Sequence, residues 1–177
     1  MATAVADAFD VPLRELHDVR GVRRHELRRG QLTEEVTADI DSRVPAGAEV
    51  EADVVIEAFD GGLEVTGTVS APWQGECRRC LANIEGHLAV EVREIFRPGG
   101  GEAEGTYPAH EDHLNLREMV VDALFAGLPV LPLCREDCRG LCPRCGADRN
   151  LEACQCAEVE VDPRWAGLRA LHDFPTE

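Results

Sequence analysis

Residues 50–71, VEADVVIEAFDGGLEVTGTVSA, alternate apolar and polar side chains over two runs. The first run, within 49–59, has an apolar residue at every second position from Val50 to Ala58, and the second run does the same from Leu63 to Ala71. A period of two is typical of a β-strand with one buried face. Asp60-Gly61-Gly62 separates the runs and favours a tight turn, because glycine adopts positive φ readily. These residues therefore predict an antiparallel β-hairpin.

The same alternation continues on both sides of this hairpin. Apolar residues at every second position from Leu88 to Val92 predict a third strand that ends near Phe96. Residues Val36–Ile40 predict a further strand. Residues 97–111 are rich in glycine, proline and acidic residues and have no apolar period, so we expect a flexible linker there.

One helix is predicted after the linker, over residues 115–127. Apolar side chains recur at helical spacing from Leu116 to Leu124, and Asn115 with Glu118 is a plausible capping arrangement. The helix should end before Pro129. Residues 9–130 therefore predict an α+β fold, in which an antiparallel β meander or a partly open barrel is packed by one or two helices.

The second predicted domain, residues 131–177, is dominated by cysteine. Cys142-Pro143-Arg144-Cys145-Gly146 has the form of a metal knuckle, because two cysteines two residues apart in a tight turn can both reach one ion. Cys154 and Cys156 follow after a short loop and complete a four-thiolate set. The sequence thus predicts a zinc-ribbon-like module, followed by a short helix over 163–171.

Four cysteines remain, and they can form a second site. Cys77-Arg78-Arg79-Cys80 lies between two predicted strands, and Cys134 and Cys138 follow the predicted helix. We therefore predict two structural zinc ions, the second one bound by these four thiolates. Three alternatives stay open. A single ion could leave Cys77 and Cys80 as buried thiols. These two cysteines could instead form a thiol-redox pair, or the metal could belong to an iron–sulfur cluster.

The charge of the chain restricts its chemistry and its partners. The net charge is −16, and all 18 basic residues are arginine, which excludes lysine Schiff-base chemistry and a P-loop lysine. A basic stretch over 11–30 carries six of the arginines against three acidic residues. Its candidate partner-binding residues are Arg23, Arg24, Arg28 and Arg29. The alternative is that these arginines form a solvated face with internal ion pairs.

No catalytic constellation or targeting signal is recognisable. Met1–Ala8 has neither a basic start nor a long apolar run, and the apolar stretch Ala123–Leu133 is interrupted by Pro129 and Pro132. We therefore expect a cytoplasmic protein that does not enter a membrane and is not an enzyme.

Several short motifs in a fixed order resemble the YceD family of large ribosomal RNA accumulation proteins. They are Cys77-Arg78-Arg79-Cys80-Leu81, Pro132-Leu133-Cys134, Asp137-Cys138-Arg139-Gly140-Leu141-Cys142-Pro143, Cys145-Gly146-Ala147-Asp148 and Asp162-Pro163-Arg164-Trp165. The resemblance implies a role in the synthesis, processing or stability of large-subunit ribosomal RNA.

The partner implied by this resemblance is a ribosomal RNA precursor or a basic large-subunit ribosomal protein. An acidic chain opposes phosphate contacts but suits a basic protein. A zinc-stabilised adaptor, or a thiol-redox protein, unrelated to ribosomes is the alternative function.

Overall fold

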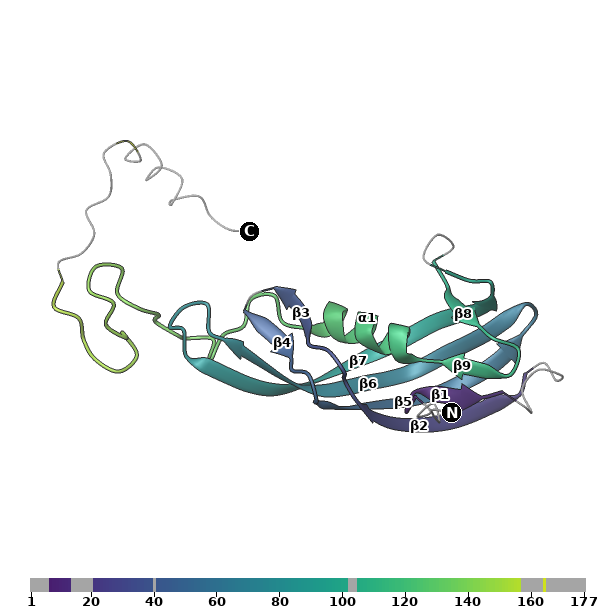
Figure 1. Ribbon diagram of the computed structural model, residues 1–177. Helices are drawn as coiled ribbons and strands as arrows, with labels where there is room; N and C mark the ends of the chain where they lie inside the picture. Colours follow the sequence, from purple (N-terminus) through teal and green to yellow (C-terminus); the bar gives the residue numbers. More distant parts are fainter. Residues whose placement is uncertain (1–6, 14–20, 40, 102–104, 157–163, 165–177) are drawn as a thin grey trace. The chain divides into compact units, whose positions relative to one another are not determined.

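The computed structural model describes residues 7–13, 21–39, 41–101, 105–156 and 164. The chain forms two compact units, Met1–Cys138 and Arg139–Glu177. Within the described residues, the first unit contains every strand and the helix (Figure 1). These elements are β1 (Asp10–Pro12), β2 (Arg23–Gln31), β3 (Val36–Asp39), β4 (Ser42–Val44), β5 (Glu49–Phe59), β6 (Gly62–Glu76), β7 (Asn83–Pro98), β8 (Tyr107–Ala109), β9 (His113–Asn115) and α1 (Arg117–Gly127).

Strand β6 is the centre of a seven-stranded sheet. It pairs antiparallel with β5 and β4 along one edge and with β7 along the other, and β2 pairs with β5. The predicted meander of three strands is confirmed as β5, β6 and β7, and the further strand predicted at Val36–Ile40 is β3. The sheet is open rather than closed into a barrel.

Helix α1 lies along one face of this sheet and closes the core (Figure 1). Its buried residues, Met119, Val120, Ala123 and Leu124, pack in the same core as the inward side chains of β5, β6 and β7. The approach is close at Gly127, where an added Cβ would lie 2.3 Å from Cγ2 of Val90. The structure differs slightly from the predicted capping: α1 begins at Arg117, and Asn115 Oδ1 accepts a hydrogen bond from the Arg117 backbone N–H at 2.8 Å.

Part of the stretch expected to be a flexible linker forms a strand. Strand β8 lies inside this stretch and pairs parallel with the end of β7. The Tyr107 ring stacks on Phe96 with ring centroids 5.1 Å apart, and its hydroxyl donates to Asp122 at 2.9 Å. Glycine and proline content indicated a linker, but one aromatic residue anchors the segment to the core. The helix predicted over 163–171 lies outside the described residues, apart from Arg164.

The start of the first unit is tied to the beginning of α1. The Asp7 carboxylate accepts two hydrogen bonds from the Arg117 guanidinium, at 2.6 and 2.8 Å, and another from Asn115 at 3.2 Å. Strand β1 follows Asp7 and pairs antiparallel with β9 in a separate two-stranded sheet. Residues far apart in the chain therefore close one end of the core.

Candidate metal centres

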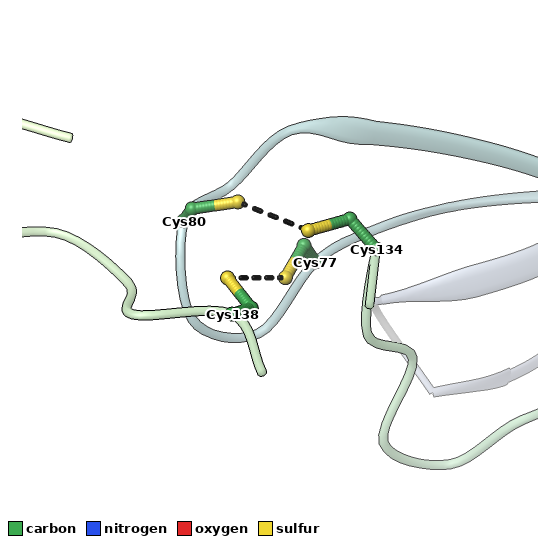
Figure 2. Close-up of side chains that lie close together, drawn as sticks. All are labelled: Cys77, Cys80, Cys134 and Cys138. Atoms are coloured by element: carbon green, nitrogen blue, oxygen red, sulfur yellow. Dashed lines mark hydrogen bonds between the residues drawn. The ribbon is translucent and has the colours of Figure 1, made fainter. Parts of the chain in front are cut away.

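The first four-cysteine cluster lies at the tip of the β6–β7 hairpin. Cys77 and Cys80 come from the turn, and Cys134 and Cys138 come from the segment after α1; Figure 2 shows the four side chains pointing toward one another. The Sγ atoms of Cys77 and Cys138 are 3.8 Å apart, and those of Cys80 and Cys134 are 3.7 Å apart. All four sulfurs lie within 4.8 Å of one another, so this cluster can hold one metal ion.

Backbone hydrogen bonds set the shape of the turn that carries Cys77 and Cys80. The Leu81 N–H donates to the Cys77 carbonyl at 2.8 Å, and the Cys77 N–H donates to the Ala82 carbonyl at 2.8 Å. Leu81 has a φ of 60°, in the left-handed region that favours glycine. The turn is therefore closed around the two sulfurs by its own backbone.

Two arginines between the first pair of cysteines attach the turn to the opposite segment. The Arg78 backbone N–H donates to the Pro132 carbonyl at 3.0 Å. The Arg79 guanidinium donates to the carbonyls of Glu136 and Cys138, at 3.0 and 2.9 Å. These contacts hold the two halves of the cluster together. Sequence reasoning did not assign this role to Arg79, although its place between two cysteines is a signal for it.

The second cluster lies within the second unit and uses the same turn. Its residues are Cys142, Cys145, Cys154 and Cys156, with sulfurs again within 4.8 Å of one another. The Gly146 N–H donates to the Cys142 carbonyl at 2.9 Å, and the Cys142 N–H donates to the Ala147 carbonyl at 2.8 Å. Gly146 has a φ of 73°. The structure thus brings the eight cysteines together in the two groups that their spacing predicted.

The thiols of each cluster influence one another's ionisation. Burial would raise the pKa of Cys77, but backbone N–H donors from Cys134, Arg79 and Cys80 lower it to about 6. Backbone N–H donors from Cys145 and Arg144 lower the pKa of Cys142 to about 6 as well. The pKa of Cys134 is raised to about 12 by burial and by neighbouring sulfurs. Neighbouring thiolates repel one another, which makes the last thiols of a cluster hard to deprotonate. A metal cation among the sulfurs would offset this repulsion and bind all four in the thiolate form.

The four candidate partner-binding arginines lie on β2, and its period of two divides them between two faces. Arg23 and Arg29 share one face and form ion pairs across to β5, with Glu57 at 2.8 Å and Glu51 at 2.6 Å. The other pair, Arg24 and Arg28, shares the opposite face with Glu26, at 2.6 and 2.8 Å. The structure does not gather the four side chains into one basic patch.

Comparison with known proteins places this chain in a family. The family model described as "Large ribosomal RNA subunit accumulation protein YceD" matches residues 65–172, more than half of the chain. The chain belongs to the YceD family. The matched YceD range contains all eight cysteines and both clusters, but it does not include β2 or its arginines.

Curated relatives come from mycobacteria, and none has a described activity. Uncharacterized proteins of Mycobacterium bovis and Mycobacterium tuberculosis are 37% identical over 131 residues, which cover 71% of this chain and 63% of theirs. A Mycobacterium leprae protein is 34% identical over 128 residues, covering 69% of this chain and 58% of its own length. The chain thus spans about three fifths of the curated relatives that it matches. No solved structure matches it significantly.

Helix α1 is too short to cross a bilayer, and the described residues contain no other helix that could do so.

Proposed function

We propose that this chain is a ribosome biogenesis factor that supports the synthesis, processing or stability of large-subunit ribosomal RNA, acting in the cytoplasm by binding rather than by catalysis. The family match carries this proposal, because its model is described by large ribosomal RNA accumulation. The chemistry of the cysteines supports a binding role: all eight lie in the two clusters, where each thiol can serve as a metal ligand.

We further propose that each cluster holds one structural zinc ion. Tetrahedral zinc with Zn–S bonds of about 2.3 Å places its sulfurs about 3.8 Å apart. The sulfur distances of 3.7 and 3.8 Å in the first cluster agree with this value. In the second cluster the Cys145–Cys154 distance of 3.7 Å agrees as well, whereas the Cys142–Cys154 distance of 3.3 Å is shorter. Sulfurs this close fit a single ion better than an iron–sulfur cluster, which would separate the thiolates by several inorganic atoms. Elemental analysis of the reduced protein should give two zinc ions per chain; one, none, or iron would contradict the proposal.

A basic protein of the large subunit is the partner that the charges favour. The chain is strongly acidic, and the arginines of β2 are already paired with carboxylates. Binding to RNA phosphates would require breaking these pairs, whereas a basic protein would be attracted by the acidic surface. Ribosomal RNA precursor is therefore the second candidate, and Arg23 and Arg29 are its best contacts, because their side chains are 71% and 60% exposed.

Crosslinking in cells, followed by identification of bound proteins and sequencing of bound RNA, separates the two partners. The proposal expects crosslinks to a lysine- or arginine-rich large-subunit protein and co-sedimentation with large-subunit precursors. Crosslinks to ribosomal RNA that are lost in R23Q/R29Q and kept in the control R24Q/R28Q would favour direct RNA binding. A chain that never sediments with large-subunit precursors would favour an adaptor or redox protein unrelated to ribosomes.

The redox alternative has a separate test. Cys77 and Cys80 are buried, and their sulfurs contact those of Cys138 and Cys134. Thiol titration of the metal-loaded protein should therefore find both cysteines unreactive. Rapid labelling of the pair with metal retained would support a redox function instead.

A further inference from the structure

The two cysteine turns have the same backbone hydrogen bonds but differ in one residue type, and metal binding does not account for this difference. Each turn makes the same two backbone hydrogen bonds and needs a left-handed residue directly after its second cysteine. That residue is Gly146 in one turn and Leu81 in the other. A left-handed conformation is strained for leucine and easy for glycine. The Leu81 side chain is also 61% exposed, so burial in the first unit does not compensate for the strain.

Three further apolar side chains are exposed on the segment that meets the turn carrying Leu81. Leu81 follows Cys80, and Leu133 precedes Cys134, whose sulfur lies 3.7 Å from that of Cys80. Leu131 and Leu133 flank Pro132, whose carbonyl accepts the Arg78 N–H of the same turn. The exposed fractions are 60% for Val130, 63% for Leu131 and 38% for Leu133. We call Leu81, Val130, Leu131 and Leu133 the apolar tip.

The charged groups around the apolar tip define the kind of partner that fits it. Arg78 is paired with Asp41 at 2.6 Å, Arg135 is paired with Asp137 at 3.3 Å, and the Arg79 guanidinium is bound to two carbonyls. In contrast, the exposed carboxylates of Glu76, Glu85 and Glu136 form no ion pair with any described residue. The Arg79 guanidinium keeps its charge, because its two partners are neutral carbonyls. Three carboxylates against this one guanidinium leave the net unpaired charge at this end of the hairpin negative.

A shallow hollow beside the apolar tip also carries unpaired acidic groups. It has a volume of about 120 Å³, and Glu76, Glu85 and Arg43 line it. The Arg43 guanidinium is already paired with Glu35 at 3.4 Å, so the two glutamates are the carboxylates that a partner could bind. Asn83, which also lines the hollow, is two residues beyond Leu81. An arginine or lysine side chain next to an apolar contact would find carboxylates there.

We propose that the apolar tip is the docking site for a basic protein segment, which places an apolar side chain against Leu81 and Leu131 and its cationic side chains toward Glu76 and Glu85. This inference rests on the proposed function for its class of partner. It explains why a strained, exposed leucine occupies a position where glycine would form the same turn. Strain of this kind is found at functional sites, where the side chain itself is needed.

The decisive variant is Leu81→Gly, because it relieves strain and removes only the exposed side chain. The probe is the protein fraction of large ribosomal subunits, extracted free of RNA and passed over the immobilised metal-loaded chain. We expect the wild-type chain to retain a lysine- or arginine-rich protein, and L81G to bind it roughly tenfold more weakly, as loss of one buried leucine contact predicts. L131S should weaken binding by a similar factor.

The matched control is Leu151→Gly, since Leu151 is 85% exposed in the second unit and lies outside the apolar tip. L151G should bind like the wild type, and all three variants should retain their metal. Equal binding by L81G and the wild type would overturn the inference. So would self-association of the wild type that L81G abolishes, because the occupant would then be a second copy of this chain.

Sedimentation with large-subunit precursors distinguishes failure of the proposed function from failure of the docking site. If neither the wild type nor L81G sediments with large-subunit precursors, the proposed function fails. If both sediment equally, only the docking site at the apolar tip fails.

Discussion

Replacing Cys80 by serine should destabilise the first unit as a whole. The Cys80 and Cys134 sulfurs meet across 54 positions of sequence, so a metal ion between them closes a long loop. The chain-entropy relation for such a closure gives about 4 kcal/mol. A serine hydroxyl stays neutral and is a poor substitute for a thiolate. The expected loss is a large part of the total free energy of unfolding, which is about 5–15 kcal/mol for a domain.

Cys154→Ser is the matched perturbation in the other cluster. The Cys142 and Cys154 sulfurs are separated by 12 positions, which corresponds to about 3 kcal/mol by the same relation. The two effects differ mainly in location, because the second cluster lies entirely within the unit Arg139–Glu177. C154S should therefore leave the β-sheet unit close to its original stability.

Trp73 provides a reporter for the first unit alone. The chain has two tryptophans, and Trp165→Phe leaves Trp73, which packs against Gly86 within the sheet. Urea unfolding followed by Trp73 fluorescence should show a lower midpoint for C80S and an unchanged midpoint for C154S. A chelator added to the parent should reproduce the C80S shift. An unchanged midpoint for C80S, or equal shifts for both variants, would refute the reasoning.

Three further predictions concern single positions in the first unit. The Arg117 guanidinium, through its hydrogen bonds, lowers the pKa of Asp7 to about 2 from 3.8. Asp7→Asn should therefore reduce the free energy of unfolding at pH 7 by about 1–2 kcal/mol, after a discount for the partial exposure of Asp7. The urea midpoints of the parent and of D7N should converge as the pH falls from about 4 to 2, because the Asp7 carboxylate of the parent becomes protonated. Gly67→Ala should cost about 3 kcal/mol in the same assay, because its Cβ would lie 2.2 Å from the Asp53 carbonyl oxygen; a stability equal to the parent would show that β5 can move aside. Leu81→Gly should leave unfolding free energy unchanged or raise it by up to about 1 kcal/mol, and a clear loss of thermal stability would show that Leu81 has a structural role.

Local pattern was enough to predict the strands and the cysteine turns. Strand β5 and strand β6 could be read from residues 50–71, because one face of each strand is buried and polarity must then alternate. The turn at Cys142 could be read from its own five residues, since both sulfurs and the glycine that allows the turn are adjacent in sequence. Features of this kind depend on contacts within a few residues.

Contacts between distant segments decided the remaining features. Strand β8 is held in place because Tyr107 stacks on Phe96 and donates a hydrogen bond to Asp122. The amino-acid composition around Tyr107 does not indicate these distant partners. The four arginines of β2 divide into two pairs, because successive side chains of a strand point to opposite faces. The net charge of residues 11–30 does not reveal this division. The conformation of Leu81 is imposed by two backbone hydrogen bonds that close its turn, against its own preference. The amino-acid sequence therefore determined which residues could bind metal, and the tertiary structure decided what surface surrounds them, because exposure and charge pairing depend on which segments meet in space.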